Sequence, residues 1–313
     1  MIICDPHHHL WYGNEIQYSV GDFLKDIKGG HRIEKTVFIE SRLMLRKDSS
    51  PDMQPVGETE FVQQVVTDLS LKDDGLNIAA GIVGFADLTL GRAVEPVLDA
   101  HISAGKGRFR GIRHSCAWDQ NPQFNKSRWN IPRGLLLDRK FRDGFAFLRK
   151  YDMTFDAWIF HPQLMELADL AREFSETKII INHIGGPLGT GPYAGIRDEV
   201  SVIWKRGLAE LCKYPNVYIK LGGLGMEICG FGWHERAIPP NSMELAEVMA
   251  PYYLWCIDQF GPDRCMFESN FPVDKRSYSY TIIWNAFKRI AGELSYQDRC
   301  ALFHDTAVKV YSI

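Results

Sequence analysis

Short runs of apolar residues alternate with longer amphipathic stretches from one end of the chain to the other. The apolar runs are rich in Val, Ile and Phe, which is typical of strands buried on both faces of a sheet. These runs cover residues 2–5, 35–40, 78–85, 108–113, 153–160, 178–182, 216–221 and 265–269. Between them, apolar residues recur at helical spacing on one face, as at Leu164, Leu167 and Ala171. The expected helices cover residues 58–71, 93–103, 141–150, 163–174, 200–213, 242–260 and 278–292.

Eight strands, each followed by a helical stretch, predict an α/β fold with a parallel sheet. The count favours a closed (β/α)8 TIM barrel over an open doubly wound sheet. No GxGxxG or Walker A run follows an early strand, which argues against a nucleotide-binding sheet. We expect one domain over residues 1–313, because α/β barrels of about 250 residues form single domains. Three long polar stretches directly follow strands, where a barrel places its active-site loops, and they cover residues 115–139, 185–198 and 222–240.

The composition excludes several classes of protein. Lys and Arg number 36 against 39 Asp and Glu, so the chain has no basic field that would hold a nucleic acid. No apolar run approaches the ~20 residues of a membrane span, and the first residues lack a signal-peptide pattern. The seven cysteines form no CxxC pair, which argues against a disulfide framework or a cysteine zinc site. We therefore expect a cytoplasmic protein that acts on a small molecule, without nucleic acid or membrane partners.

The first strand runs into three consecutive histidines. In an extended backbone residues i and i+2 point to the same face, so His7 and His9 would both face the barrel mouth. Two neutral imidazoles on one face form half of a site for Zn²⁺ or a similar divalent ion. The alternative is a solvated turn with no ligand role. The position of the pair at the end of an apolar first strand favours the metal site.

Three other histidines also lie at strand ends. His183 ends the run 178–182, His161 follows Phe160, and His114 follows the fourth strand. A single histidine in such a place is more often packed or hydrogen-bonded than a ligand. Four strand ends with histidine favour a shared site, because catalytic groups of barrel enzymes lie at the carboxyl ends of the strands.

The eighth strand carries polar residues toward its carboxyl end. Alternation puts Glu268 and Asn270 on the same side, with Asn270 nearer the mouth. A buried glutamate needs a partner, because an unpaired buried charge costs several kcal/mol. Lys220 in the seventh strand and Glu40 at the end of the second are candidates for that network. The network could hold the barrel together or take part in catalysis.

Six motifs in chain order resemble one known family. They are Asp-Pro-His-His-His-Leu-Trp at 5–11, Gly-Ile-Arg-His at 111–114, Phe-Asp-Ala-Trp-Ile-Phe-His-Pro-Gln-Leu at 155–164, Ile-Asn-His-Ile-Gly-Gly-Pro at 181–187, Lys-Leu-Gly-Gly-Leu at 220–224 and Met-Phe-Glu-Ser-Asn-Phe-Pro-Val-Asp at 266–274. Together they resemble the amidohydrolase superfamily, in its amidohydrolase-2 branch of TIM-barrel metal-dependent hydrolases. Within that branch they are most similar to the sugar-lactone and 2-pyrone-4,6-dicarboxylate lactonase-like group.

The resemblance implies a barrel that hydrolyses small lactones, esters or amides at the carboxyl ends of its strands. The family's first-strand HxH motif matches His7 and His9, and its sixth-strand histidine matches His183. Where a metal is bound these residues are its ligands, and in some lactonase-like members they act on substrate without one. The family's last-strand Asp, which activates water, is Asn270 here. Asparagine cannot accept that proton, so the usual general base is missing.

Three replacements for this base are chemically reasonable. Glu268 could serve if desolvation raised its pKa, and Asp274 could reach back from the following loop. A metal on the three histidines could also lower the pKa of water enough to dispense with a carboxylate. We prefer Asp274, because a rim position would meet both water and substrate, with Glu268 as a brace paired to Lys220.

Further residues are candidates for substrate binding. Arg113 is the best candidate to bind a substrate carboxylate or carbonyl, since its planar fork can bind two oxygens. The same arginine could equally brace the barrel. His114, His161 and Trp11 are the other residues that we expect near the substrate.

The sequence therefore favours a lactonase-like hydrolase with zinc or another divalent metal, or with a metal-independent mechanism. A second interpretation is a metal-dependent decarboxylase or hydratase of an aromatic-derived acid. A third, prompted by Asn270, is a barrel that binds a ligand and has lost catalysis. Barrels of this size often pair, so a homodimer is compatible with the sequence.

Overall fold

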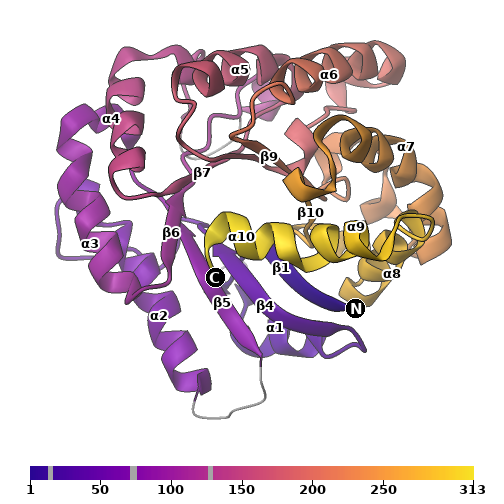
Figure 1. Cartoon of the computed structure of the whole chain (residues 1–313), viewed down its shortest axis with the longest axis horizontal. Coiled ribbons are helices and arrows are strands. Elements are labelled where there is room, and N and C mark those ends of the chain that lie inside the picture. The colour runs from indigo at the N-terminus through magenta and orange to yellow at the C-terminus, as the bar shows by residue number, and fades with distance from the viewer. Residues whose placement is uncertain (13–16, 71–75, 126–129) are drawn as a thin grey trace.

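The computed structural model describes residues 1–12, 17–70, 76–125 and 130–313. Eight parallel strands form a ring with helices around its outside, a (β/α)8 TIM barrel (Figure 1). Their order around the ring follows the chain, so the predicted fold class and all eight predicted strands are confirmed. The strands are β1 (Ile2–His8), β4 (Arg32–Ile39), β5 (Asn77–Gly84), β6 (Phe109–Ile112), β7 (Thr154–Ala157), β8 (Ile179–Ile181), β9 (Val217–Leu221) and β10 (Cys265–Phe267).

The helices cover the outside of this ring (Figure 1). The seven predicted helices are present, with ends shifted by a few residues: α2 (Val56–Ser70), α3 (Glu95–Gly105), α4 (Arg139–Lys150), α5 (Leu164–Glu173), α6 (Arg197–Leu211), α7 (Ser242–Phe260) and α8 (Tyr280–Ile290). Among the elements that were not predicted are α1 (Val20–Ile27), α9 (Tyr296–Cys300), α10 (Thr306–Tyr311) and the hairpin of β2 (Trp11–Tyr12) and β3 (Gln17–Tyr18). No helix within the described ranges has the length and apolar character needed to cross a bilayer.

The barrel strands are buried on both faces, as their apolar runs predict. In β8 all three isoleucines are fully buried. Residues on the outer faces of the strands pack against the helices, as Phe155 packs against Phe145 of α4 with ring centroids 5.0 Å apart. Residues inside the barrel form a separate cluster with the C-terminal helix, made of Cys4, Val37, Ile39, Val83, Ile180, Met266, Ala307, Val310 and Tyr311.

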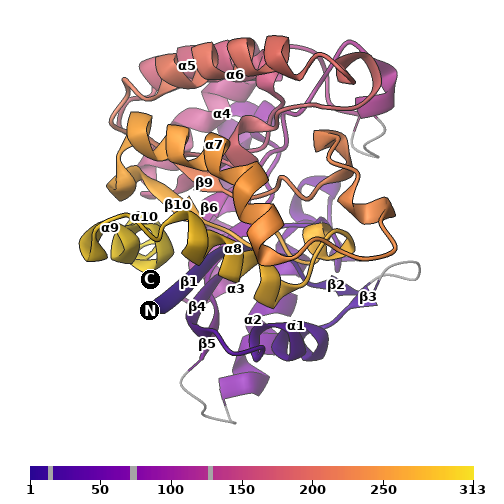
Figure 2. The ribbon, with the colours of Figure 1, turned by 90° about the vertical axis from the view of Figure 1, so that its right-hand side faces the viewer.

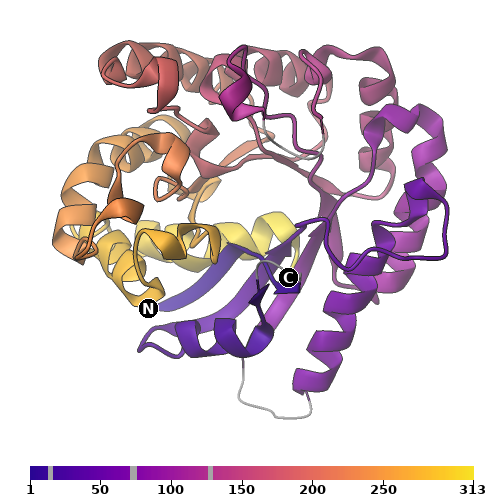
Figure 3. The ribbon, with the colours of Figure 1, turned by 180° about the vertical axis from the view of Figure 1, so that it is seen from behind.

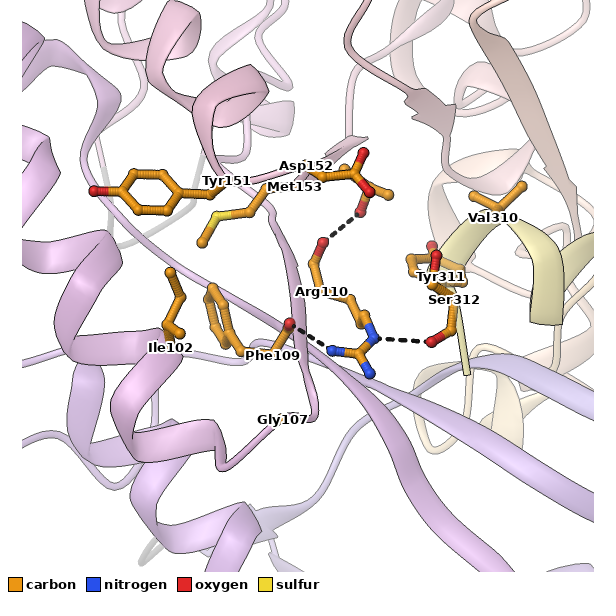
Figure 4. Close-up of a pocket in the computed structure, with 11 residues that line it drawn as sticks. Ile102, Gly107, Phe109, Arg110, Tyr151, Asp152, Met153, Val310, Tyr311 and Ser312 are labelled. Carbon is orange, nitrogen blue, oxygen red and sulfur yellow. Dashed lines mark hydrogen bonds between the residues drawn. The ribbon is translucent and has the colours of Figure 1, made fainter.

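The C-terminal segment closes the amino-terminal end of the barrel. The Tyr311 hydroxyl donates to both carboxylate oxygens of the buried Asp156, each 2.9 Å away. Arg110, at the start of β6, donates from Nε to the Ser312 carbonyl at 3.3 Å. Figure 4 shows this arginine in a cavity that lies between the first residues of β6 and β7 and the C-terminal residues. The cavity therefore lies at the end of the barrel opposite to the loops that follow the strands.

The barrel closes between β1 and β10 at its carboxyl end. The His9 amide donates to the Phe271 carbonyl at 2.8 Å, and the Asn270 amide donates to the His7 carbonyl at 3.1 Å. These bonds place the first-strand histidines beside the polar residues of the last strand. Helices α9 and α10 lie at one end and the β2–β3 hairpin at the other (Figure 2), and Figure 3 shows the barrel from behind.

Candidate active site

The three histidines of β1 alternate in direction, as the sequence predicts. His8 stacks on Phe23 with ring centroids 4.2 Å apart, and its Nε2 lies 2.9 Å from Thr36 Oγ1. His7 and His9 point the other way, and their Nε2 atoms lie 3.3 Å apart. His7 and His9 therefore both face the interior of the barrel, whereas His8 points the other way and has a structural role.

The protein sets the protonation of these rings. His9 Nδ1 lies 2.8 Å from the Ile39 carbonyl, which can only accept, so this nitrogen carries the proton. His7 Nδ1 lies 2.7 Å from Glu268 Oε2 and 3.4 Å from Lys220 Nζ, and His7 Nε2 lies 3.3 Å from Arg113 Nη1, which can only donate. Both Nε2 atoms are then left with lone pairs that face each other. Burial holds the pKa of His7 and of His9 well below the usual value, so both rings are neutral.

Glu268 joins the third histidine to this pair. Its Oε1 lies 2.6 Å from His183 Nδ1 and accepts the His183 backbone amide at 3.1 Å. The His7 and His183 rings lie 4.5 Å apart, centroid to centroid. The structure therefore brings His7, His9 and His183 together at the mouth of the barrel. His183 and Asn270 both adopt left-handed backbone angles, with φ of 52° and 55°, a strain that is common at functional sites.

The donor set suits a divalent metal ion. Two nitrogens about 2.0–2.1 Å from one tetrahedral ion would be about 3.4 Å apart, close to the 3.3 Å between His7 and His9. His7, His183 and Glu268 also offer ligand atoms that all lie within 4.8 Å of one another. Metal-binding imidazoles commonly give their second nitrogen to a carboxylate or carbonyl, as His9 does with Ile39 and His183 with Glu268. His7, His9 and His183 could hold an ion, with Glu268 as a brace or a further ligand.

The expected pairing of Glu268 with Lys220 is wrong. Met266 pairs with Lys220 in the sheet register, so Glu268 lies one layer nearer the mouth than the lysine. Lys220 instead contacts Asp156 Oδ1 at 2.7 Å and donates to the Pro6 carbonyl at 2.9 Å. The lysine and its aspartate form a fully buried ion pair beneath the histidines.

Arg113 lies next to the histidines but is also braced. It donates from Nε to Glu40 Oε1 at 2.7 Å and from Nη2 to the Glu40 carbonyl at 2.6 Å. Its Nη1 lies 3.3 Å from His7 Nε2. Glu40 therefore fixes the arginine, as the bracing alternative expects, and its third nitrogen faces the histidine centre.

The predicted position of Asp274 at the solvent-exposed rim is wrong. A 3-10 helix over Val273–Arg276 turns the chain inward, and the carboxylate is fully buried. It accepts hydrogen bonds from Asn270 Nδ2 at 2.8 Å, the Tyr278 hydroxyl at 2.6 Å and the Gly225 amide at 3.2 Å. Burial raises the pKa of Asp274 to about 7. Its connection to the histidine centre runs through Asn270.

The remaining predicted residues lie farther from the histidine centre. His114 accepts the Leu88 amide at 3.2 Å, and burial lowers its pKa to about 3. His161 accepts the Leu188 amide at 3.4 Å. Neither ring contacts His7, His9 or His183 in the part of the chain that the structure describes. Trp11 is half-buried and stacks near His9, with ring centroids 6.3 Å apart.

Two buried residues near the site were not singled out from the sequence. Asp156 lies in β7, where its place inside the barrel follows from alternation only once the strand boundary is known. Arg42 follows Glu40 by two residues, and its Nε lies 3.7 Å from Glu40 Oε2. The only sequence signal for Arg42 was its position two residues after Glu40, just beyond the end of a strand.

The chain belongs to the amidohydrolase family, because residues 4–313 match the model of that family. An uncharacterized protein of Sinorhizobium fredii, y4mH, is 33% identical over 326 residues, which cover 99% of this chain and 98% of that protein. The L-fucono-1,5-lactonase of Burkholderia multivorans is 28% identical over 321 residues, 99% of this chain and 95% of that enzyme. A crystal structure of a Burkholderia multivorans amidohydrolase with bound zinc covers all of both chains, with a TM-score of 0.75 and 23% identity.

Proposed function

We propose that this protein hydrolyses a small lactone, with water attacking the ring carbonyl at the barrel mouth. One observation carries the proposal: His7, His9 and His183 converge with Glu268 at the carboxyl ends of the strands, where TIM barrels hold their catalytic groups. Membership of the amidohydrolase family supports hydrolysis. The similarity to an L-fucono-1,5-lactonase supports a cyclic ester as the substrate.

We also propose zinc, or another divalent ion, as the cofactor. His7 and His183 would hold it with His9, whose Nε2 lies 3.3 Å from that of His7, and the zinc bound to the Burkholderia amidohydrolase supports that choice of metal. An ion at this site would polarise an ester carbonyl and favour the ionisation of water.

The protein's own groups orient the reaction. The Ile39 carbonyl and Glu268 fix the rings of the three histidines, so their free nitrogens are presented without reorganisation. Arg113 brings a fixed positive charge to within 3.3 Å of His7 Nε2. A cation there favours the negative charge that develops on the carbonyl oxygen when an ester is attacked.

Glu268 is the carboxylate that we propose as proton acceptor. Its two oxygens contact the rings of His7 and His183, and no other carboxylate of the described residues has a side-chain contact with either ring. Glu268 Oε2 accepts no hydrogen bond from the described residues, so this oxygen can accept a proton from the attacking water directly. Asp274 is hydrogen-bonded to Asn270 and reaches the histidine centre only through that residue, so we assign it a positioning role.

The test is turnover of a lactone panel by the purified protein. The panel contains five- and six-membered sugar lactones, with hydrolysis followed by proton release against the spontaneous rate. We expect protein-dependent hydrolysis of at least one lactone. Release of CO2 from a hydroxybenzoic acid without lactone turnover would favour the decarboxylase interpretation, and turnover of neither would favour a binding protein.

A further inference from the structure

A cavity of about 250 Å³ lies beside the histidine centre. Its lining residues include Glu40, Arg42, Arg113, Ser115, Trp158 and Phe160. Two of them join it to the centre. Arg113 Nη1 lies 3.3 Å from His7 Nε2, and the Trp158 ring packs edge-on to the His183 ring with centroids 4.9 Å apart. A molecule whose reacting group is at the histidines would extend into this cavity.

Among the described residues, the charged groups that line the cavity are two guanidinium groups and one carboxylate. Glu40 shares its oxygens between them: Oε1 lies 2.7 Å from Arg113 Nε, and Oε2 lies 3.7 Å from Arg42 Nε. The Arg42 guanidinium also stacks on the Phe85 ring, with Cζ 3.4 Å from the ring centroid. Both arginines are therefore held in place, and together with Glu40 they give the lining a net positive charge.

The loop that carries Arg42 is held in a strained conformation. Arg42 has a φ of 54°, in the left-handed region that non-glycine residues rarely adopt. The buried Glu58 accepts the backbone amides of Ser41, Arg42 and Leu43 at 3.0, 3.2 and 3.1 Å. A Cβ at Gly57 would lie 2.6 Å from the Met44 carbonyl oxygen, so the loop can pack this closely only against glycine. The left-handed backbone conformation of Arg42 costs free energy, and it places the arginine side chain at the cavity.

Part of the cavity lining is aromatic. Trp158 and Phe160 pack edge-to-face with centroids 5.5 Å apart, and Phe124 packs against Phe160 at 5.9 Å. Aromatic faces of this kind can pack against the ring of a substrate. The arginines can then bind a charged substituent of that ring. We propose that this cavity binds a carboxylate substituent of the substrate lactone, and that Arg42 determines the preference for lactones that carry such a carboxylate. This inference rests on the proposed lactonase function.

The test compares two lactones that differ only at C6. D-Glucaro-1,4-lactone carries a carboxylate there, and D-glucono-1,4-lactone carries a hydroxymethyl group. We expect kcat/KM to be at least about tenfold higher for the carboxylated lactone, as a charged hydrogen bond predicts. Arg42→Gln should remove that preference mainly through KM, and Arg42→Lys should restore part of it. Arg46→Gln is the control, because Arg46 lies on the same loop and pairs with Glu60 at the surface.

Equal kcat/KM values for the two lactones in the wild-type protein would overturn the inference and leave the lactonase function intact. An equal loss for both lactones in Arg42→Gln would also overturn it, since the arginine would then be structural. If neither lactone is hydrolysed, binding is tested instead by measuring the melting temperature of the protein in the presence of each lactone. Stabilisation of the wild type by the carboxylated lactone alone, absent in Arg42→Gln, supports the charged subsite, and equal stabilisation by both contradicts it.

Discussion

The amide of Asn270 donates a hydrogen bond to the carboxylate of Asp274 across 2.8 Å, and both side chains are fully buried. The residue that stands at the family's general-base position is thus hydrogen-bonded to the carboxyl group of Asp274. Since burial raises the pKa of that carboxyl to about 7, the pair is sensitive to pH near neutrality.

Asp274→Asn should remove part of the pH dependence of stability. The folded pKa of about 7 lies above the unfolded value of about 4, so the stability contributed by this group is complete below pH ~4 and is lost as the pH rises through 7. The wild type should therefore lose up to about 1.4 kcal/mol per pH unit relative to the variant between pH ~4 and ~7. Urea unfolding of both proteins from pH 5 to 8.5 measures it. A difference that stays constant with pH would contradict the prediction.

Glu268→Gln should lower kcat/KM by about 100-fold or more, because it removes the proposed proton acceptor together with the carboxylate that orients the ligand histidines. One of the two imidazoles would then face an amide NH2 group instead of an oxygen. Glu60→Gln is the matched control, because Glu60 pairs with Arg46 at the surface. Full activity of the Glu268 variant, with loss of activity in Asp274→Asn, would reverse the assignment of the proton acceptor.

Lys220→Met should destabilise the protein by about 3–5 kcal/mol, because it leaves the charge of Asp156 buried without its cation. The control is Lys213→Met, which removes an exposed lysine paired with Glu210 and should change stability by less than about 1 kcal/mol. Urea denaturation measures both. Equal, small effects would show that the buried pair adds little.

Metal removal should lower both activity and melting temperature. Ligands that bind only the folded protein stabilise it, so loss of an ion from His7, His9 and His183 should appear in both measurements. Elemental analysis of protein purified without chelators should give near-stoichiometric divalent metal. Zinc added to protein that a chelator has stripped of metal should restore its activity and its melting temperature. Metal-free protein with full turnover would establish the metal-independent mechanism instead.

The strands could be predicted from the sequence because their burial on both faces leaves a continuous apolar signal. The three residues of β8 are isoleucines, and all are buried. The terminal helix α10 gave no such signal, since Ala307, Val310 and Tyr311 occupy a six-residue helix that points its apolar side into the barrel. A stretch of that length is too short for helical periodicity to be read.

The site was predictable where it depends on alternation along one strand. His7, His9 and Glu268 face inward for that reason. Contacts across the barrel were not predictable, because they depend on the register between strands and on the paths of the loops. The register puts Lys220 below Glu268, and the 3-10 turn after Pro272 brings Asp274 inside.

The most direct test of the histidine centre is lactone hydrolysis by His183→Asn, compared with the wild type and with Arg46→Gln. His183 contacts Glu268 and packs on His7, and its replacement leaves the C-terminal closure of the barrel untouched. The account predicts a loss of kcat/KM of about 100-fold or more, with a melting temperature within a few degrees of the wild type. A folded His183→Asn variant that hydrolyses the same lactones at the wild-type rate would contradict it.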